Sequence, residues 1–163
     1  MVSSVIRDAI ELIRNETDEG TINLNTNASM PERVAELADA GLDSMRISMN
    51  SARKATYDAY FRPRYEFDAI KESAHEMKKR GKFVSINLFV FPGVTDAPKE
   101  AAALKDFINT CAIDLVQWRN LNIDPDFYLE TLDQKLPAGI GMERLIAELP
   151  VRKGYFNPYL GKR

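Results

Sequence analysis

The stretch that decides the fold is FVSINLFVF, at residues 83–91. Its apolar, β-branched and aromatic composition predicts a buried strand, and Pro92-Gly93 directly after it ends that strand. The segments on either side, residues 67–80 and 98–111, carry apolar side chains at helical spacing. A strand between two helices is typical of βαβ units, so this stretch predicts a parallel sheet.

The same arrangement repeats along the rest of the chain. Three more strands are expected, at residues 21–24, 44–48 and 115–121, and helix-like segments follow each of them. We therefore predict an α/β protein with a parallel four-stranded sheet of consecutive βα units. Four such units are half of an eight-stranded barrel, or two thirds of a six-stranded one.

The composition argues against several classes of protein. Apolar residues make up 45% and charged residues 28% of the 163-residue chain, as in globular domains. The net charge of −2 gives no field of one sign for nucleic acid or a membrane surface. No apolar run approaches the ~18 residues of a membrane span. The single cysteine, Cys111, excludes an internal disulfide and predicts a reducing compartment, which we take to be the cytoplasm.

Most kinds of catalytic centre cannot be assembled from these residues. One histidine, His75, and one cysteine do not make a zinc site, and the chain has no glycine-rich phosphate loop. A nucleophilic triad lacks a second histidine and a Gly-x-Ser-x-Gly motif. We interpret His75 as a half-exposed helix residue and Cys111 as a core residue. The sequence therefore assigns no catalytic residue and no metal ligand.

Polar, mostly uncharged side chains gather where the predicted strands end, and ligand sites of parallel α/β folds lie at these ends. Each of these residues alone has an alternative explanation, because Asn and Ser also cap helices and close turns. Their grouping favours a site for a hydroxylated or zwitterionic ligand. Arg62 and Arg64 follow the second strand and could bind a carboxylate. The grouped residues are Asn25, Thr26, Asn27, Ser48, Asn50, Ser51, Asn87, Asn120 and Asn122.

The order of these motifs resembles the radical S-adenosylmethionine (SAM) enzymes. LNTNA at residues 24–28 resembles the Thr-Asn-Gly element of the family's third strand, with Ala28 in place of glycine. RISMNS at 46–51 is similar to the fourth strand, and YDAYFRPR at 57–64 to the segment after it that ends in an arginine. NLFVFPGVTD at 87–96 resembles the fifth strand and its turn, and residues 116–122 would be the sixth.

This resemblance covers residues 1–125, which we expect to be C-terminal βα units of a partial (β/α)6 barrel. Residues 126–163 are expected to be a helical and aromatic extension of the same domain. The family holds a [4Fe–4S] cluster on a Cys-x-x-x-Cys-x-x-Cys loop and the SAM amino group on a Gly-Gly-Glu-Pro-like turn. Neither motif occurs in the chain. We therefore expect the C-terminal portion of a longer enzyme, which binds no cluster by itself.

The resemblance also implies roles for the strand-end residues. Ser48 and Arg62 match positions that contact the SAM carboxylate, and Asn25 to Asn27 with Asn50 match positions near its ribose or amino acid part. Asn87 and Asn120 complete the predicted cofactor-binding set. Ala28 departs from the family pattern, because glycine tolerates backbone angles that alanine resists.

The function implied for the parent protein is abstraction of a hydrogen by a 5′-deoxyadenosyl radical from an unknown substrate, small molecule or peptide. The fragment alone is expected to be inactive. One alternative is a non-catalytic half-barrel that binds a partner or small ligand at its strand ends. A fragment of another barrel enzyme, such as an aldolase, is a weaker alternative, because no lysine is placed for a Schiff base. The strand at residues 21–24 is expected to be an edge that pairs with another copy or is covered by the C-terminal tail.

Overall fold

The computed structural model describes residues 2–133 and 138–154. Five strands form one sheet in the order β1-β2-β3-β4-β5, and every neighbouring pair is parallel. The strands are β1 (Asn23–Thr26), β2 (Ser44–Met49), β3 (Phe83–Val90), β4 (Leu115–Asn120) and β5 (Arg152–Gly154). The prediction of a parallel sheet of consecutive βα units is confirmed.

The predicted number of strands was one short. Residues 152–154, which we had assigned to the C-terminal extension, form β5 and pair with β4, with Leu115 opposite Arg152. This strand escapes sequence analysis because it has three residues and none of them is apolar or β-branched. The predicted aromatic tail beyond it lies outside the described residues.

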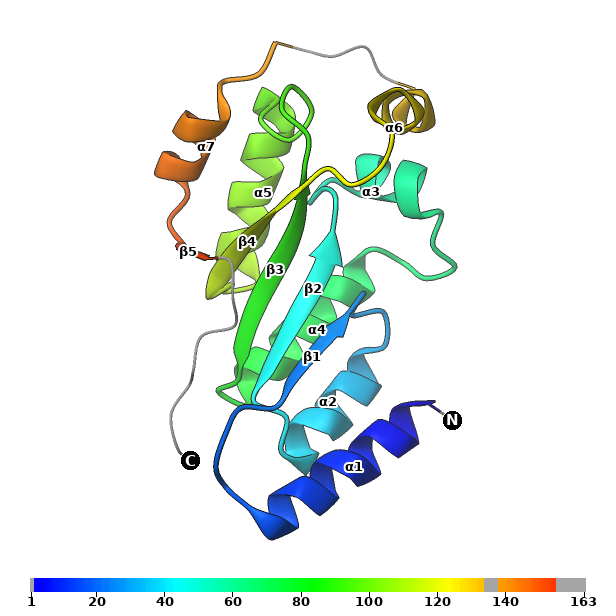
Figure 1. Ribbon diagram of the computed structural model, residues 1–163, viewed down its shortest axis with the longest axis vertical. Helices are drawn as coiled ribbons and strands as arrows, with labels where there is room; N and C mark the ends of the chain where they lie inside the picture. The colour runs from blue at the N-terminus through cyan, green and yellow to red at the C-terminus, as the bar shows by residue number, and fades with distance from the viewer. Residues whose placement is uncertain (1, 134–137, 155–163) are drawn as a thin grey trace.

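Seven helices are described, and three of them cover one face of the sheet (Figure 1). Apolar side chains of α2, α4 and α5 form a continuous core with alternate residues of β2, β3 and β4. Cys111 is fully buried in this core, as predicted. The helices are α1 (Val2–Glu16), α2 (Pro31–Ala40), α3 (Lys54–Phe61), α4 (Asp68–Lys79), α5 (Pro98–Thr110), α6 (Pro125–Leu132) and α7 (Met142–Glu148).

The opposite face of the sheet is polar. Side chains alternate between the two faces along a strand, and residues in register on neighbouring parallel strands point the same way. Ile47, Ile86 and Val116 form one apolar row toward the helices. The adjacent rows on the other face are Asn25, Arg46, Ser85 and Leu115, and Ser48, Asn87, Gln117 and Gly154.

The strands β1 to β4 all point toward the end of the molecule that carries α3 and α6, at the top of Figure 1, and the short β1 ends below the other three. The predicted residues Asn25, Ser48 and Asn120 are therefore near the carboxyl ends of their strands, although Asn25 is in the row of Arg46 and Ser85 and lies deeper than Asn120. From α6 the chain returns through α7 to the other end of β4, where β5 joins the sheet.

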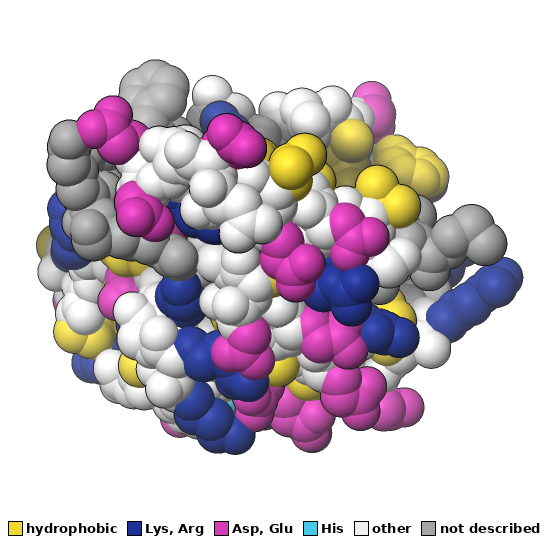
Figure 2. All heavy atoms as spheres, turned by 90° about the horizontal axis from the view of Figure 1, so that it is seen from below, with side chains coloured by type: hydrophobic (Ala, Val, Ile, Leu, Met, Phe, Trp, Pro, Cys, Tyr) yellow, Lys and Arg dark blue, Asp and Glu magenta, His cyan; other side chains and the backbone are white. Residues whose placement is uncertain are grey.

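Acidic and basic side chains are interspersed on the lower face of the molecule (Figure 2). Arg80, at the end of α4, forms ion pairs with Asp39, at 2.7 Å, and with Glu76, at 2.6 Å. Within the described parts of the chain, none of the helices combines the length and apolarity needed to cross a bilayer.

Candidate functional site

A cleft of about 590 Å³ opens at the carboxyl ends of β2, β3 and β4. Its position is the one that sequence analysis predicted, because side chains at these ends converge in parallel folds. The polar lining combines amides, a hydroxyl and a guanidinium, and the apolar lining is largely aromatic. The lining residues are Ser48, Met49, Tyr60, Phe61, Asn87, Phe89, Trp118, Arg119, Asn120 and Asn122.

The polar side of the cleft is preorganised by an arginine. The Nε of Arg119 donates a hydrogen bond of 2.9 Å to the Oδ1 of Asn87. This bond fixes the Asn87 amide with its nitrogen free to donate to a ligand. Ser48 is in register with Asn87, so its hydroxyl lies beside the amide on the same face of the sheet. Together they offer donors and acceptors suited to hydroxyl and carboxylate groups.

The aromatic side of the cleft is held by a small second core beneath α6. Tyr60 stacks on Phe89, with ring centroids 5.9 Å apart, and meets Tyr128 edge to face at 5.2 Å. Tyr128 is buried beneath them, and burial raises the pKa of its phenol to about 12, opposed by a hydrogen bond from Asn50. These contacts give the cleft a rigid apolar wall suited to a flat ring.

A buried carboxylate shapes the loop between β2 and α3. Glu100, on α5, accepts hydrogen bonds from the hydroxyls of Ser51, at 2.5 Å, and Thr56, at 2.6 Å. The guanidinium of Arg53 adds an ion pair of 3.0 Å. The carboxylate thus has three partners although its side chain is only 6% exposed. Ser51 also accepts from the backbone N–H of Arg53, so it belongs to this loop network rather than to the cleft.

Asn50 takes part in the structure of the same loop. Its Nδ2 donates to the carbonyl of Thr56 at 3.2 Å and to the hydroxyl of Tyr128 at 3.1 Å. The residue is 2% exposed and does not line the cleft. The structure therefore gives Asn50 contacts that position the loop, and its direct contact with the cofactor stays a prediction.

The polar residues in the last part of β1 and directly after it are not among the residues that line the cleft. Thr26 accepts a hydrogen bond from the N–H of Ala28, and Asn27 accepts one from Ser29, so both side chains close the turn. Asn25 accepts from Asn23 along the same strand. These contacts agree with the turn-closing alternative for Thr26 and Asn27, while the cofactor contacts of all three residues stay predictions.

Ala28 occupies the place where the family pattern has glycine. Its φ of 57° lies in the left-handed region, which explains why glycine suits this position. The residue is fully buried, and its carbonyl accepts a hydrogen bond from the Ser73 hydroxyl on α4. The alanine is thus accommodated in the backbone conformation that glycine would adopt.

Arg62 ends α3 in a left-handed conformation, with φ of 45°, and its side chain is exposed. It lies next to Phe61, which lines the cleft, but it is not itself a lining residue. Ser48, Asn87 and Asn120, in contrast, are brought together as predicted.

Sequence analysis missed a set of buried polar residues on the inner face of the sheet, which is the face opposite α2, α4 and α5. Arg46 is 7% exposed and Gln117 is fully buried, with Ser44 and Ser85 beside them. The signal that identifies them is alternation: in SMRISM the polar residues occupy every second position, and in VSINLFV Ser85 and Asn87 do so. Because both faces of a parallel strand are commonly apolar, we interpreted these strands as buried apolar runs. We therefore overlooked the polar residues at every second position, which share one face of the sheet.

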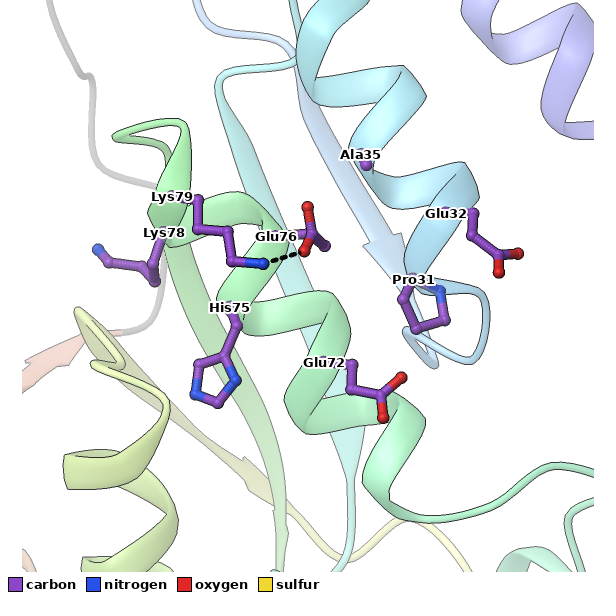
Figure 3. A pocket seen from close by; sticks show the side chains of 8 residues that line it. All are labelled: Pro31, Glu32, Ala35, Glu72, His75, Glu76, Lys78 and Lys79. Carbon is purple, nitrogen blue, oxygen red and sulfur yellow. Dashed lines mark hydrogen bonds and ion pairs between the residues drawn. The ribbon is translucent and has the colours of Figure 1, made fainter.

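A second hollow, of about 770 Å³, lies outside the sheet between α2 and α4 (Figure 3). Charged side chains line it, with Lys79 paired to Glu76 at 2.5 Å. The half-exposed His75, also on this surface, lies 3.0 Å from the Thr110 carbonyl through its Nε2. None of the predicted site residues lies here, and in residues 2–133 and 138–154 no group of three potential ligands could hold a metal ion.

Comparison with known proteins defines the class of this parallel half-barrel. The family model described as the radical SAM superfamily matches residues 3–104. The chain therefore belongs to the radical SAM superfamily, as the motif order predicted. No curated protein matches it.

Among solved structures, the chain is similar in fold to SuiB of Streptococcus suis. The TM-score is 0.55 at 15% sequence identity, over 83% of this chain and 32% of the SuiB chain. A second structure, of SuiB bound to S-adenosylmethionine, gives the same values. The chain thus spans about a third of the length of SuiB, and the likeness concerns the fold.

Proposed function

We propose that this chain supplies part of the SAM and substrate pocket of a radical SAM enzyme. The observation that carries the proposal is the cleft at the strand carboxyl ends, which combines Ser48, Asn87 and Asn120 with an aromatic wall. Membership of the radical SAM superfamily supports it. Whether the substrate is a small molecule or a peptide is left open.

The residues of the cleft fit the chemistry of SAM. Tyr60 and Phe89 present apolar rings to an adenine, and the amides of Asn87 and Asn120 suit ribose hydroxyls. The Ser48 hydroxyl suits the carboxylate, and we propose that Arg62 reaches it from the rim. In this family bound SAM supplies a 5′-deoxyadenosyl radical that removes a hydrogen atom from the substrate. The chain's own residues bind and orient the ligand and exclude water.

The iron–sulfur cluster does not fit this chain. A cluster of this family needs three cysteine ligands, and the chain has one, Cys111, which is fully buried in the core beneath α5. Burial raises the pKa of this thiol to about 11, which disfavours the thiolate that iron requires. We propose that the cluster belongs to another part of the parent enzyme. A stoichiometric iron–sulfur absorbance spectrum after anaerobic reconstitution of this chain would contradict this.

SAM binding tests the proposed site. Titration calorimetry with SAM is expected to give binding that Asn87→Ala weakens about tenfold, because the amide bonds to a charged or hydroxylated ligand are lost. Asn109→Ala, on the exposed outer side of α5, is the matched control and should leave the affinity unchanged. Equal effects of the two variants, or no SAM binding by the wild-type chain, would exclude the cleft as the SAM site.

The alternative is a non-catalytic half-barrel that binds a small ligand or partner at the same cleft. The single cysteine favours it, because the chain cannot provide a cluster alone. The coding sequence upstream of Met1 separates the two proposals. Three cysteines at Cys-x-x-x-Cys-x-x-Cys spacing there support the enzyme, and an independent start without them supports the binding module. Location in the cytoplasm remains part of the proposal.

A further inference from the structure

The inner face of the sheet carries two buried polar side chains that the cleft does not use. Arg46 is 7% exposed and Gln117 is fully buried. In the described parts of the chain, the Nε of Arg46 and both amide atoms of Gln117 lack a hydrogen-bond partner. Buried polar groups are normally satisfied, and a buried charge without a counter-charge is costly. These two residues are therefore suited to hydrogen-bond a polar ligand that reaches this face.

The two residues project from the face that carries the cleft, on the strands that flank β3. Arg46 is two positions before Ser48 on β2, so it lies about 7 Å deeper in the sheet, at 3.3 Å per residue. Gln117 is in register with Asn87, which lines the cleft. Both side chains project from the same face as Ser48 and Asn87. Gln117 is thus level with Ser48 and Asn87, and Arg46 lies one row deeper, so both border the floor of the cleft.

The charge of the face specifies the ligand. Arg46 and Arg119 project from it, and no carboxylate occupies any inner position of β1 to β4. The pKa of Arg46 is lowered, first by burial and then by the positive charge of Arg119, so the site lacks a negative charge. A guanidinium and an amide N–H suit a carboxylate or phosphate. The Gln117 carbonyl accepts hydrogen bonds, so it calls for a hydroxyl or amine donor beside the anion.

We propose that Arg46 and Gln117 form an anion subsite at the floor of the cleft, which binds a carboxylate or phosphate of the substrate next to a hydroxyl or amine. This inference deepens the proposed function and rests on it, because the substrate would then extend from the SAM cleft toward the floor of the sheet. SAM has a carboxylate of its own, which is the competing source of the anion. Arg46 lies deeper in the sheet than Ser48, and this favours the substrate over SAM as the source of the anion.

Titration of the chain with inorganic phosphate and with lactate, at constant ionic strength, tests the subsite. Lactate carries a hydroxyl next to its carboxylate. The wild-type chain is expected to bind at least one of the two, and Arg46→Met to weaken that binding about tenfold or more, because a charged hydrogen bond is lost. Gln117→Leu should weaken it as well. Arg33→Met, on the exposed side of α2, is the matched control and should bind as the wild type does.

Stability in the absence of anions is an independent readout. Removing an unpaired buried charge relieves its desolvation, so Arg46→Met should melt at or above the wild-type temperature. A clear fall in melting temperature would mean that Arg46 already has a partner, and it would overturn the proposal. Absence of anion binding by the wild-type chain, or equal binding by Arg46→Met, would overturn it too.

SAM titrations identify the source of the anion. If the substrate supplies it, Arg46→Met keeps wild-type SAM affinity. If Arg46→Met weakens SAM about tenfold but leaves decarboxylated SAM unaffected, the subsite belongs to the SAM carboxylate and the substrate assignment is wrong. Phosphate binding without any SAM binding would reject the proposed function, while the anion site itself would stand. The two proposals therefore fail in different ways.

Discussion

Glu100 has a structural role that its position in the sequence does not indicate. It follows Pro98 at the start of a predicted helix, where an acidic residue is ordinary. The structure instead places its carboxylate in the interior, where it joins Ser51, Arg53 and Thr56 across more than forty residues of sequence. The loop that leads from β2 to the aromatic wall of the cleft is therefore anchored to α5.

Replacing this carboxylate by an amide should loosen the loop. Glu100→Gln keeps the shape but loses the charge that accepts from two hydroxyls and Arg53, so we expect a loss of about 1–3 kcal/mol in the free energy of unfolding. Urea unfolding followed by circular dichroism measures it. Glu148→Gln, at an exposed position of α7, should change stability by less than about 0.5 kcal/mol. A loss no larger than this control would show that the network does not stabilise the fold.

Cys111 permits a prediction about pH. Burial raises the pKa of its thiol from the usual 9.0 to about 11, so the neutral thiol is favoured in the folded state. Its contribution to stability is complete below pH 9 and is lost as the pH rises through 11. At pH 8 a shift of two units lowers the thiolate fraction about 100-fold. Alkylation by iodoacetamide should therefore be at least that much slower in the folded than in the urea-unfolded chain.

A cysteine at an exposed position of the same helix provides the control for the alkylation experiment. Asn109→Cys in a Cys111→Ala background should react at similar rates in the folded and unfolded chains, because residue 109 is exposed. Folded and unfolded rates within tenfold of each other for the native Cys111 would contradict its burial.

At the scale of the elements, the sequence predicts which segments are helices and strands better than where they end. The apolar runs and stripes identified β1 to β4 because burial of a face requires them. Ser29 is of a residue type that often caps helices, but Met30 occupies the cap position of α2 and makes no side-chain hydrogen bond. Capping depends on the local backbone angles, which residue type alone does not determine. Arg46 and Gln117 were missed for a related reason. Their burial depends on which face of the sheet each residue points to, and this must be known for all four strands together.

The end of α5 offers a test at this scale. The N–H of Ile113 bonds to Ile108 and that of Ala112 to Asn109, which is the pattern of a Schellman motif. Ala112 therefore adopts a left-handed conformation, with φ of 49°, on an exposed site. Ala112→Gly should raise the free energy of unfolding by about 1 kcal/mol, because glycine has no Cβ penalty there.

The same substitution inside the helix should have the opposite sign. Ala102 is exposed within α5, so Ala102→Gly should lower the free energy of unfolding by about 1 kcal/mol. Thermal and urea unfolding of the two variants measure both effects. Destabilisation by Ala112→Gly would contradict the left-handed geometry at the helix end.

At the scale of the whole molecule, the strand order of consecutive parallel neighbours is the feature that places the cleft. Because each strand pairs with the next in sequence, the carboxyl ends of β2, β3 and β4 bring Ser48, Asn87 and Asn120 into one cleft. This order could be predicted from the repeated βα units and the motif order. Asn25, Thr26 and Asn27 lie outside the lining of this cleft, and their contact with SAM stays a prediction, since side chains that close a turn and side chains that bind a ligand look alike in a sequence.

The same strand order leaves β1 with a single neighbour among the described residues, β2. A strand edge presents backbone N–H and C=O groups to any strand that can align with it, so we predict that the chain associates through this edge. Light scattering after size-exclusion chromatography, over a range of concentrations, should show a dimer that dissociates on dilution.

Asn25 is exposed on β1, and Asn25→Lys adds a charge that opposes strand pairing, so it should shift the equilibrium toward the monomer. Asn109→Lys, on the outside of α5, controls for the added charge and should leave association unchanged. A wild-type chain that stays monomeric at every concentration, or a dimer that Asn25→Lys does not weaken, would show that β1 is not the contact.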